Sequence, residues 1–426
     1  MVHKRFLSVL LLFSLILFAL PGASLAQQGD SFPVPPGRLV AGDDKGLYTM
    51  QADGSDKTYL AEVTETGCWL RDGVWSPDGT KIMYTAICGG SSPYDWRPDP
   101  GRTDLRERTA KVMVYDLATS SSGELVPSDG VHQDYAGDWN PNGDEIVIYS
   151  DRDPSAIFNL YTFDLASASL TQLTTFDSNA SRVSYDPTGR YLLYNRHIIE
   201  TNQFEVRALD LSNMTELRVA AGLTPNWSPD GKWIAYATEG ETSDVFVMPA
   251  DCIYQDGDCN ADRDARNITY TPEISDREPL FSPDQTQIVY VRNTNPTPGV
   301  IAWDIYRQDL LTGLLENLSN TPDTEERQRS WEPVKVDSRA DVASVLPVVA
   351  RVFTSEGVAN LRAEPTTNAN IVGQTSSGQM LFVVGATSNR SWYRITLPAD
   401  GAQAWIFGNL ITAVQGDLAR VPVVQE

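Results

Sequence analysis

Apolar and polar residues alternate along most of this chain in short, strand-like runs. Five of these runs follow a shared turn of an aromatic residue, a polar residue, proline, a polar residue and glycine, with glutamine replacing glycine in the fifth copy. The five copies begin at Trp75, Trp139, Tyr185, Trp227 and Phe281, and their prolines lie 64, 46, 42 and 54 residues apart. A strand-based unit repeated about every 40–50 residues predicts a β-propeller.

Each turn leads into an apolar strand that ends in tyrosine, at Tyr84, Tyr149, Tyr194, Tyr236 and Tyr290. Proline presets the first central position of such a turn, Asp or Asn suits the next, and glycine takes the left-handed position that follows. An Asp-Leu strand comes later in each unit, at Asp116, Asp164, Asp210 and Asp309, with a degenerate copy at 248–251. We therefore expect four strands per blade, with the aromatic residue packed between neighbouring blades.

The two ends of the array are incomplete. Residues 39–62 contain the last three strands of a blade without an inner strand, whereas residues 329–333 contain an inner strand with nothing after it. Together they would complete a sixth blade and leave no open sheet edge at the junction. Residues 37–335 resemble the TolB-type, WD40-like propeller repeats, which implies a six-bladed propeller.

The amino terminus predicts export. Lys4 and Arg5 precede an uncharged run over 6–20, and Ser24 and Ala26 offer small residues for cleavage after position 26. The alternative is an uncleaved membrane anchor; no later segment reaches transmembrane length. We expect a periplasmic, cell-wall-associated or extracellular protein.

Charge narrows the classes of partner. The chain has 33 basic and 56 acidic residues, a net charge of −23, which argues against nucleic acid because phosphates require Lys and Arg. The acidity belongs to the propeller, since residues 351–414 contain four arginines and three acids.

Four cysteines in an exported chain predict two disulfides. Cys68 precedes an inner strand and Cys88 follows a tyrosine strand, so both lie on one face of a propeller and can pair. Cys252 and Cys259 would close a small loop on the opposite face. Free thiols are the alternative for either pair.

The face that carries Cys68 and Cys88 also receives most long loops, and binding residues concentrate on loops held by a scaffold. The longest loop, 85–109, contains aromatic and arginine residues typical of recognition hot spots. The alternative is that the aromatic residues only pack this loop against the propeller. The candidate binding residues on this face are Tyr94, Asp95, Trp96, Arg97, Arg102, His132 and His197. No nucleophile elbow or Ser/His/Asp arrangement is visible, so no catalytic residue is assigned.

One acidic loop alternates oxygen-bearing side chains at every second position: Asp256, Asp258, Asn260, Asp262 and Asp264. Calcium prefers such ligands, but the bidentate glutamate of a regular calcium loop is missing. A solvated acidic turn is the alternative, and no other cofactor is expected.

Residues 351–414 form a second module of short strands, joined by a linker at 336–350 and followed by a tail at 415–426. An Asn-Leu-Arg start at Asn360, a Trp-Tyr-Arg-Ile strand at Trp392 and a terminal Trp-Ile at Trp405 resemble a bacterial SH3-like (SH3b) domain. The resemblance implies binding of cell-wall peptides or envelope targeting. Trp392, Tyr393 and Trp405 are the candidate contacts; one of the first two should face the barrel core, and Trp405 should wall an exposed groove.

These features predict an all-β chain, a six-bladed propeller followed by a small SH3-like barrel. We expect an exported, monomeric, non-catalytic binding protein with an envelope or extracellular protein or glycan as partner, and peptidoglycan peptide as a candidate for the SH3b module. The alternative is a secreted glycan lyase or hydrolase on the looped face, which His132, His197 and the acidic loop would have to serve.

Overall fold

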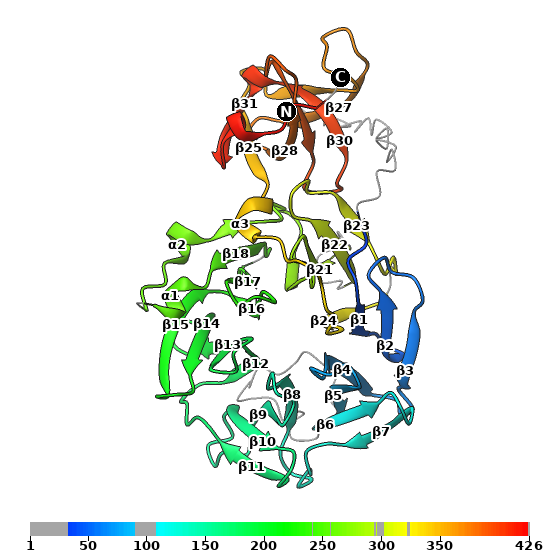
Figure 1. Cartoon of the computed structure of the whole chain (residues 1–426), viewed down its shortest axis with the longest axis vertical. Helices are drawn as coiled ribbons and strands as arrows, with labels where there is room; N and C mark the ends of the chain where they lie inside the picture. Colours follow the sequence, from blue (N-terminus) through cyan, green and yellow to red (C-terminus); the bar gives the residue numbers. More distant parts are fainter. Residues whose placement is uncertain are drawn as a thin grey trace, which may run out of the picture.

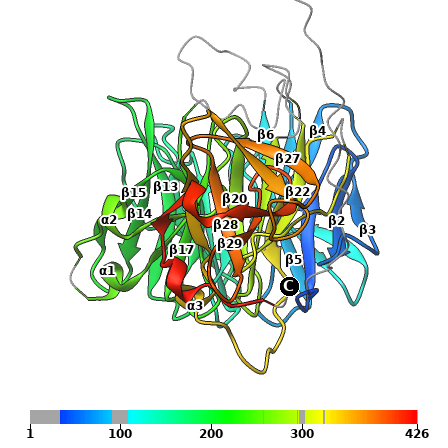
Figure 2. The same ribbon diagram turned by 90° about the horizontal axis from the view of Figure 1, so that it is seen from above.

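The computed structural model describes residues 33–89, 108–240, 242–255, 257–293, 295, 302–321 and 324–424. Six four-stranded antiparallel sheets form a ring, and a seven-stranded sheet lies beside it, as Figure 1 shows. The predicted all-β fold class, a six-bladed propeller followed by a second small β module, is confirmed. Figure 2 shows the ring from its side, with the second sheet, orange to red, in front of it.

The first three blades follow one another along the chain. Blade 1 comprises β4 (Cys68–Trp75), β5 (Lys81–Cys88), β6 (Thr109–Asp116) and β7 (Ser121–Glu124). Blade 2 comprises β8 (Asp134–Trp139), β9 (Glu145–Ser150), β10 (Asn159–Asp164) and β11 (Ser169–Gln172). Blade 3 comprises β12 (Ala180–Tyr185), β13 (Tyr191–Ile198), β14 (Gln203–Asp210) and β15 (Thr215–Ala221).

The next two blades continue the pattern. Blade 4 comprises β16 (Leu223–Trp227), β17 (Trp233–Ala237), β18 (Val245–Pro249) and β19 (Arg266–Asn267). Two short helices, α1 (Asp251–Tyr254) and α2 (Ala261–Asp264), lie between its last two strands. Blade 5 comprises β20 (Asp276–Phe281), β21 (Gln287–Asn293), β22 (Trp303–Asp309) and β23 (Leu315–Asn317).

Blade 6 joins the two ends of the propeller, as the incomplete repeats predicted. Its strands are β24 (Arg327–Trp331), β1 (Arg38–Gly42), β2 (Gly46–Gln51) and β3 (Thr58–Glu62), in that order. Leu39 pairs with Trp331 across the junction. The Arg38 guanidinium also donates to both carboxylate oxygens of Glu332, at 3.0 and 2.9 Å. The closure therefore joins positions almost 300 residues apart and protects the strand edges there.

The repeated turn explains why the blades share one geometry. Glycine adopts a left-handed φ of 71° at Gly79, and Gln285, its counterpart in blade 5, adopts 61°. Glutamine is accommodated because its side chain bonds on both sides: it accepts from the Asp230 amide at 2.9 Å and donates to the Ala340 carbonyl at 2.8 Å. Gln285 therefore links blade 5 both to blade 4 and to the segment that follows the propeller.

A second recurring feature places polar side chains at the propeller axis. The pairing of β4, β8, β12, β16 and β20 with the next strand is interrupted by a register shift. Left-handed residues lie at this break in four blades: Asp72, Arg182, Thr224 and Glu278, with φ of 52–56°. A β-bulge changes the direction in which a side chain points. Non-glycine residues with a strained backbone are concentrated at functional sites.

The C-terminal sheet has the order β27-β26-β30-β29-β28-β25-β31. Its strands are β25 (Val348–Val352), β26 (Val358–Arg362), β27 (Ile371–Ser376), β28 (Met380–Ala386), β29 (Trp392–Thr396), β30 (Gln403–Phe407) and β31 (Ile411–Gln415). It begins at Val348, inside the segment expected to be linker, and the expected tail packs on it. Val421 is 2% exposed in the module core, and the Val424 amide donates to the Ala386 carbonyl at 3.0 Å.

The module docks on blades 4 and 5 of the propeller. Phe382 of β28 is 1% exposed, and its ring lies edge-on to Tyr270 at a centroid distance of 6.3 Å. Gly313 has a left-handed φ of 66°, and a Cβ there would lie 2.3 Å from the Phe382 ring. Arg292 of β21 donates to the Ala399 carbonyl at 2.8 Å. The connecting helix α3 (Val342–Val345) adds to this contact, because Val342 is fully buried against blade 5.

Candidate functional site

A cavity of about 220 Å³ lies on the axis, at the end of the propeller that carries the Cys68–Cys88 bridge. All six blades contribute to it, and the contributions divide by chemistry. Blades 5, 6 and 1 supply a charged half: Arg277, Glu278, Arg327, Arg71 and Asp72. Blades 2, 3 and 4 supply a mainly apolar half: Tyr135, Tyr149, Phe158, Ala180, Phe204 and Leu223, together with the polar residues Ser181, Arg182, Asn195 and Thr224.

The charged half is held by bonds within the propeller. Arg71 is 3% exposed and donates to the Asp43 carbonyl at 2.6 Å, which orients its guanidinium at the inner end of β4. Arg277 is only partly buried, and its Nε donates to Ser243 Oγ at 3.1 Å. Arg277 and Arg327 are therefore less buried than Arg71.

Ion pairs across the axis form the floor of the cavity. Arg182 binds Asp72 Oδ1 at 2.7 Å and Glu278 Oε1 at 3.0 Å, so that one side chain joins blades 1, 3 and 5. Arg327 of blade 6 binds the same Glu278 oxygen at 3.0 Å. Next to these ion pairs lies a smaller space of about 30 Å³, lined in part by Ser184, Asn226 and Arg329.

The apolar half is an aromatic wall. The Tyr135 and Tyr149 rings stack at 5.1 Å, and Phe158 meets them edge-on at 5.6 and 6.2 Å. Burial raises the pKa of Tyr135 to about 12, so its hydroxyl stays protonated at neutral pH. The wall therefore offers ring faces and edges rather than charge.

Two buried oxygens at the cavity have no hydrogen-bond partner within the described part of the chain. They are Asn195 Oδ1, on a residue 4% exposed, and Glu278 Oε2, on a residue 7% exposed. Both residues line the cavity. Buried polar groups are nearly always bonded, so these acceptors mark where a donor belongs.

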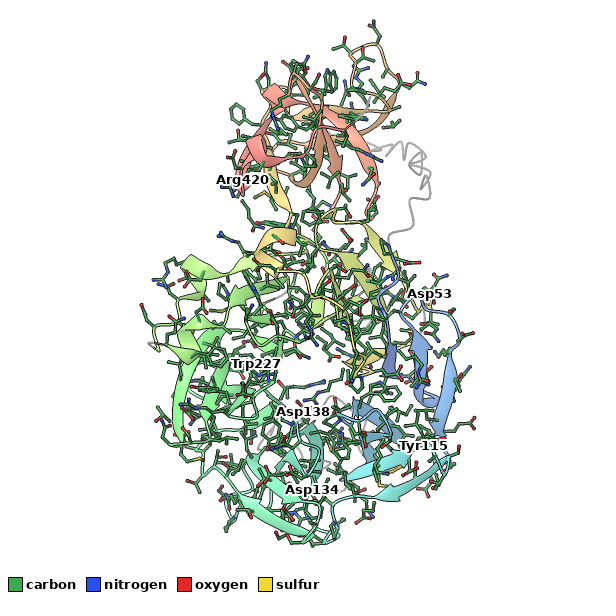
Figure 3. The ribbon with its side chains drawn as sticks, in the orientation of Figure 1. Asp53, Tyr115, Asp134, Asp138, Trp227 and Arg420 are labelled. Carbon is green, nitrogen blue, oxygen red and sulfur yellow. A yellow bond between two sulfur atoms is a disulfide. The ribbon has the colours of Figure 1, made fainter. Side chains whose placement is uncertain are left out.

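The opposite mouth of the channel is a separate cavity of about 310 Å³. Asp138 of β8 lies in its wall and accepts hydrogen bonds from the Trp139 and Tyr185 amides at 2.8 and 2.9 Å. Burial raises the pKa of Asp138 to about 6, although these amides and nearby Arg329 favour its charged form. In Figure 3, Asp138 and Trp227 lie beside the central opening, whereas Asp53 lies at the outer rim.

Of the binding residues expected on the looped face, the two that the structure describes, His132 and His197, do not line the axial cavity. Tyr94, Asp95, Trp96, Arg97 and Arg102 lie outside the described residues. His132 is partly exposed and contacts Asp129 Oδ2 through Nδ1 at 2.6 Å, away from the cavity.

His197 lies in β13 rather than in a loop, which corrects its expected position. It is 9% exposed, its ring lies 5.0 Å from that of Phe204, and Nε2 contacts Asn202 at 3.0 Å. The ring therefore supports the cavity wall from behind and does not line the cavity.

Both predicted disulfides are present. Cys68 and Cys88 are directly opposite each other in the β4–β5 pairing, and Cys252 is joined to Cys259. Among the described residues, the one cluster with metal-like spacing is Glu65, Cys68 and Cys88. Its two sulfurs are bonded to each other, so it does not offer thiolate ligands.

The acidic loop does not gather its side chains around one point. Asn260 caps α2 by accepting from the Arg263 amide at 3.2 Å, and Asp264 pairs with Arg263 at 2.6 Å. Asp258 lies 3.9 Å from the same guanidinium. Asp256 lies outside the described residues, and Asp262 belongs to α2. Calcium binding there stays a prediction, with three of its expected ligands, Asp258, Asn260 and Asp264, already in contact with Arg263.

The SH3b candidates are all buried. Tyr393 faces the module core as expected, while Trp392 packs on the other side of the sheet, edge-on to Phe407. The expectation that Trp405 walls an exposed groove is wrong: the side chain is 9% exposed. Its strand β30 is central, so Arg362 and Arg394 flank it on both sides. The exposed aromatic residue of the described module is Phe353, at 73%.

The sequence analysis did not identify the residues that meet at the propeller axis, although they recur at one position of the repeat. Asp72, Arg182, Thr224 and Glu278 each lie three positions before the aromatic residue of the repeated turn. Charged residues at this position of a buried inner strand contradict an apolar pattern, and such violations mark functional or strained sites.

Among the described residues, no helix is both long and apolar enough to span a membrane.

Comparison with known proteins identifies the C-terminal module. Residues 357–412 match the family described as Bacterial SH3 domain. Uncharacterized protein Atu1656 of Agrobacterium fabrum (strain C58 / ATCC 33970) is 22% identical over 231 residues, covering 51% of this chain and 74% of that protein.

Two solved structures are similar in fold. TolB from Acinetobacter baumannii is 16% identical, with 71% of this chain and 68% of that chain covered and a TM-score of 0.47. Oligogalacturonate lyase from Vibrio parahaemolyticus is 12% identical, with 63% and 72% covered and a TM-score of 0.42. The two disulfides are typical of proteins that fold outside the reducing cytosol. The chain thus combines a six-bladed propeller, whose structural neighbours include TolB-type proteins, with a bacterial SH3 domain at residues 357–412.

Proposed function

We propose that this is an exported, non-catalytic binding protein. The SH3b module targets it to cell-wall peptide or another envelope component, and the face of the propeller that carries Cys68–Cys88 binds a protein or glycan partner. The observation that carries the proposal is the axial cavity on that face, with its charged half and its aromatic wall. Pockets that combine an apolar lining with a few placed polar groups are the usual form of a ligand site.

The position of the two histidines favours binding over catalysis. A lyase or hydrolase on this face would need a proton acceptor at the substrate, for which histidine is the most common group. His132 lies outside the cavity lining, and His197 lies behind Phe204. The groups that do line the cavity are guanidiniums, carboxylates, amide oxygen and aromatic rings, which recognise ligands readily.

The docked module supports a fixed arrangement of two binding surfaces. Phe382, Tyr270 and Gly313 hold the SH3b sheet against the propeller. Phe353 projects from the module and is the exposed aromatic group available to an external partner. A rigid connection would present the cavity at a constant distance from the wall.

Co-sedimentation with purified peptidoglycan tests the targeting half of this proposal. We expect residues 27–426 to pellet with the wall, and Phe353→Ser to reduce the pelleted fraction. The control is Val131→Ser, because Val131 is 78% exposed on the propeller. Failure of the parent protein to pellet, or an equal loss in both variants, would contradict wall targeting through the module.

A further inference from the structure

We propose that the cavity of about 310 Å³ at the opposite mouth of the channel, the mouth cavity, binds a neutral sugar ring. This cavity lies at the other end of the propeller from the axial cavity that carries the proposed function, so the inference goes beyond that function. The hydroxyl groups of the sugar would bond to side chains of blades 2, 3 and 4, and its C–H groups would contact apolar side chains of blades 5 and 1. The volume falls within the range of small-ligand pockets, which begins at about 300 Å³.

One position of the repeat supplies a side chain from every blade to the wall of the mouth cavity. It is the position just before the aromatic residue that ends each inner strand. In blades 1 to 6 it holds Val74, Asp138, Ser184, Asn226, Leu280 and Ser330. Successive side chains of a strand point to opposite sides, so this position faces the channel when the aromatic residue packs between blades. Blades 2, 3 and 4 place polar groups there, whereas blades 5 and 1 place aliphatic ones, so the wall has a polar and an apolar side.

The charged side chains described in this wall already have partners in the protein. The carboxylate oxygens of Asp138 accept two backbone amides, and Arg329 donates to backbone carbonyls of blades 2 and 3 at 3.2 and 2.9 Å. Glu332 is paired with Arg38, and Arg339 donates to a backbone carbonyl of blade 5 at 3.2 Å. A charge on the ligand would have to compete with these partners after losing its own hydration, which favours a neutral ligand.

Neutral hydrogen-bonding groups of the same wall are unsatisfied. Within the described part of the chain, Ser184 Oγ and the indole nitrogens of Trp227 and Trp331 are buried without a hydrogen-bond partner, and all three residues line the mouth cavity. The indole of Trp139, at the equivalent position of blade 2, donates to the Val74 carbonyl at 3.2 Å, so the repeat can satisfy this group internally. Buried polar groups are nearly always bonded, and these donors therefore indicate a ligand that supplies acceptors.

A sugar matches this wall because each hydroxyl group both donates and accepts a hydrogen bond. A hydroxyl can accept from an indole N–H or from the amide of Asn226, and it can donate to a remaining lone pair of Asp138. Val74 and Leu280 contact the C–H groups that alternate with the hydroxyls around a pyranose ring. A hydrocarbon of the same size would leave the polar side of the wall unsatisfied.

Isothermal titration of residues 27–426 tests the charge and the source of the ligand. The probes are the neutral sugars glucose and N-acetylglucosamine, the cation glucosamine and the anion glucuronate. Maltotetraose and chitotetraose present the two neutral sugars as ends of chains. We expect at least one neutral sugar to bind in the low-millimolar range, about tenfold more tightly than both charged sugars. Tighter binding of the tetrasaccharide than of its monosaccharide indicates the end of a glycan as ligand, and equal or weaker binding indicates a free sugar.

Variants locate the site. Asn226→Ala should weaken binding of the favoured sugar about tenfold, since it removes a donor and an acceptor. Trp227→Phe keeps an aromatic ring but removes the indole N–H, and should weaken binding about threefold. The matched control is Asn142→Ala, because Asn142 is exposed in the repeated turn of blade 2, at the same end of the propeller, and does not line the cavity. Thermal unfolding of each variant confirms that it folds.

Binding of neither neutral sugar, or equal binding of neutral and charged sugars, would overturn the inference. Equal affinities of Asn226→Ala and Asn142→Ala would do the same. Loss of binding in Phe158→Leu but not in Asn226→Ala would assign the sugar to the axial cavity, against the inference. The peptidoglycan assay on the same preparations is independent: a protein that pellets with the wall but ignores the sugars retains its targeting role.

Discussion

Arg182 of β12 and Glu278 of β20 form an ion pair across the propeller axis, with Nη2 and Oε1 3.0 Å apart. Both residues have a left-handed backbone, at φ of 54° and 56°. The same guanidinium binds Asp72 of β4, so alternate blades are joined at the centre of the ring. The bulge directs both side chains toward the axis, where their ion pairs form the floor of the cavity. These interactions offset the cost of the left-handed backbone.

Loss of this central cation should destabilise the whole propeller. Arg182→Gln removes one of two ion pairs from each of Asp72 and Glu278 and leaves Asp72 with only the longer Arg329 contact, at 3.7 Å, so we expect the free energy of unfolding to fall by about 3 kcal/mol. Urea denaturation measures the change. Adding Asp72→Asn should recover part of the loss, since it removes the carboxylate that has lost its shorter ion pair. Arg218→Gln on the exposed outer strand should change stability by less than about 0.5 kcal/mol, and an equal effect of the two arginines would contradict a special role for the axis.

Asp138 should make stability fall as pH rises. Its folded pKa is about 6, above the usual 3.8, so the folded state holds a proton that the unfolded state has lost between about pH 4 and 6. The contribution from neutral Asp138 is complete below pH 4 and is lost as pH rises through 6, by about 3 kcal/mol. Urea midpoints from pH 4 to 7 would reveal it. Asp138→Asn should flatten this part of the profile, and an unchanged slope in that variant would assign the effect to other groups.

The two disulfides should differ modestly in their contribution. Cys68 and Cys88 are 20 residues apart, so the double replacement Cys68→Ser/Cys88→Ser should lower the free energy of unfolding by about 3 kcal/mol through loop entropy alone. The separation of 7 residues at Cys252–Cys259 predicts about 2.5 kcal/mol for its replacement. Urea denaturation compares both variants with the parent protein. A reductant should affect the parent but not a protein lacking both bridges, and insensitivity of the parent would mean that the bridges do not form.

The SH3b module should come loose when its anchoring ring is removed. Phe382 lies outside the module core and is 1% exposed only because the propeller covers it, so Phe382→Ala should weaken docking while leaving the module folded. Limited trypsin digestion should then cleave faster after Arg339, whose Nε is otherwise bonded to the Pro283 carbonyl at 3.2 Å. Phe353→Ala is the matched control, because Phe353 is 73% exposed on the same module. Equal cleavage of both variants would show that Phe382 does not hold the interface.

Local patterns were sufficient for the architecture. The turn after Trp75 and its four counterparts has a chemistry that only a few backbone conformations satisfy, so the blades could be counted in the sequence. The half-blades at 39–62 and 329–333 predicted the closure that β1 and β24 make. Strand order also placed Cys68 opposite Cys88, since each blade alternates its loops between two faces.

The cavity required the tertiary structure. Arg182 lies 110 residues from Asp72 and 96 from Glu278, and no local pattern links such positions. Their side chains meet because ring closure brings inner strands from alternate blades to one axis, where bulges turn them inward. The solvent exposure of individual side chains could not be predicted from the sequence either. Trp405 is covered because its strand is central in the sheet, and Phe382 is covered because the propeller packs against it. The sequence by itself determined the repeated units and their order, because turns and strands depend on neighbouring residues; closure and docking decided which side chains meet, because those contacts depend on the whole ring.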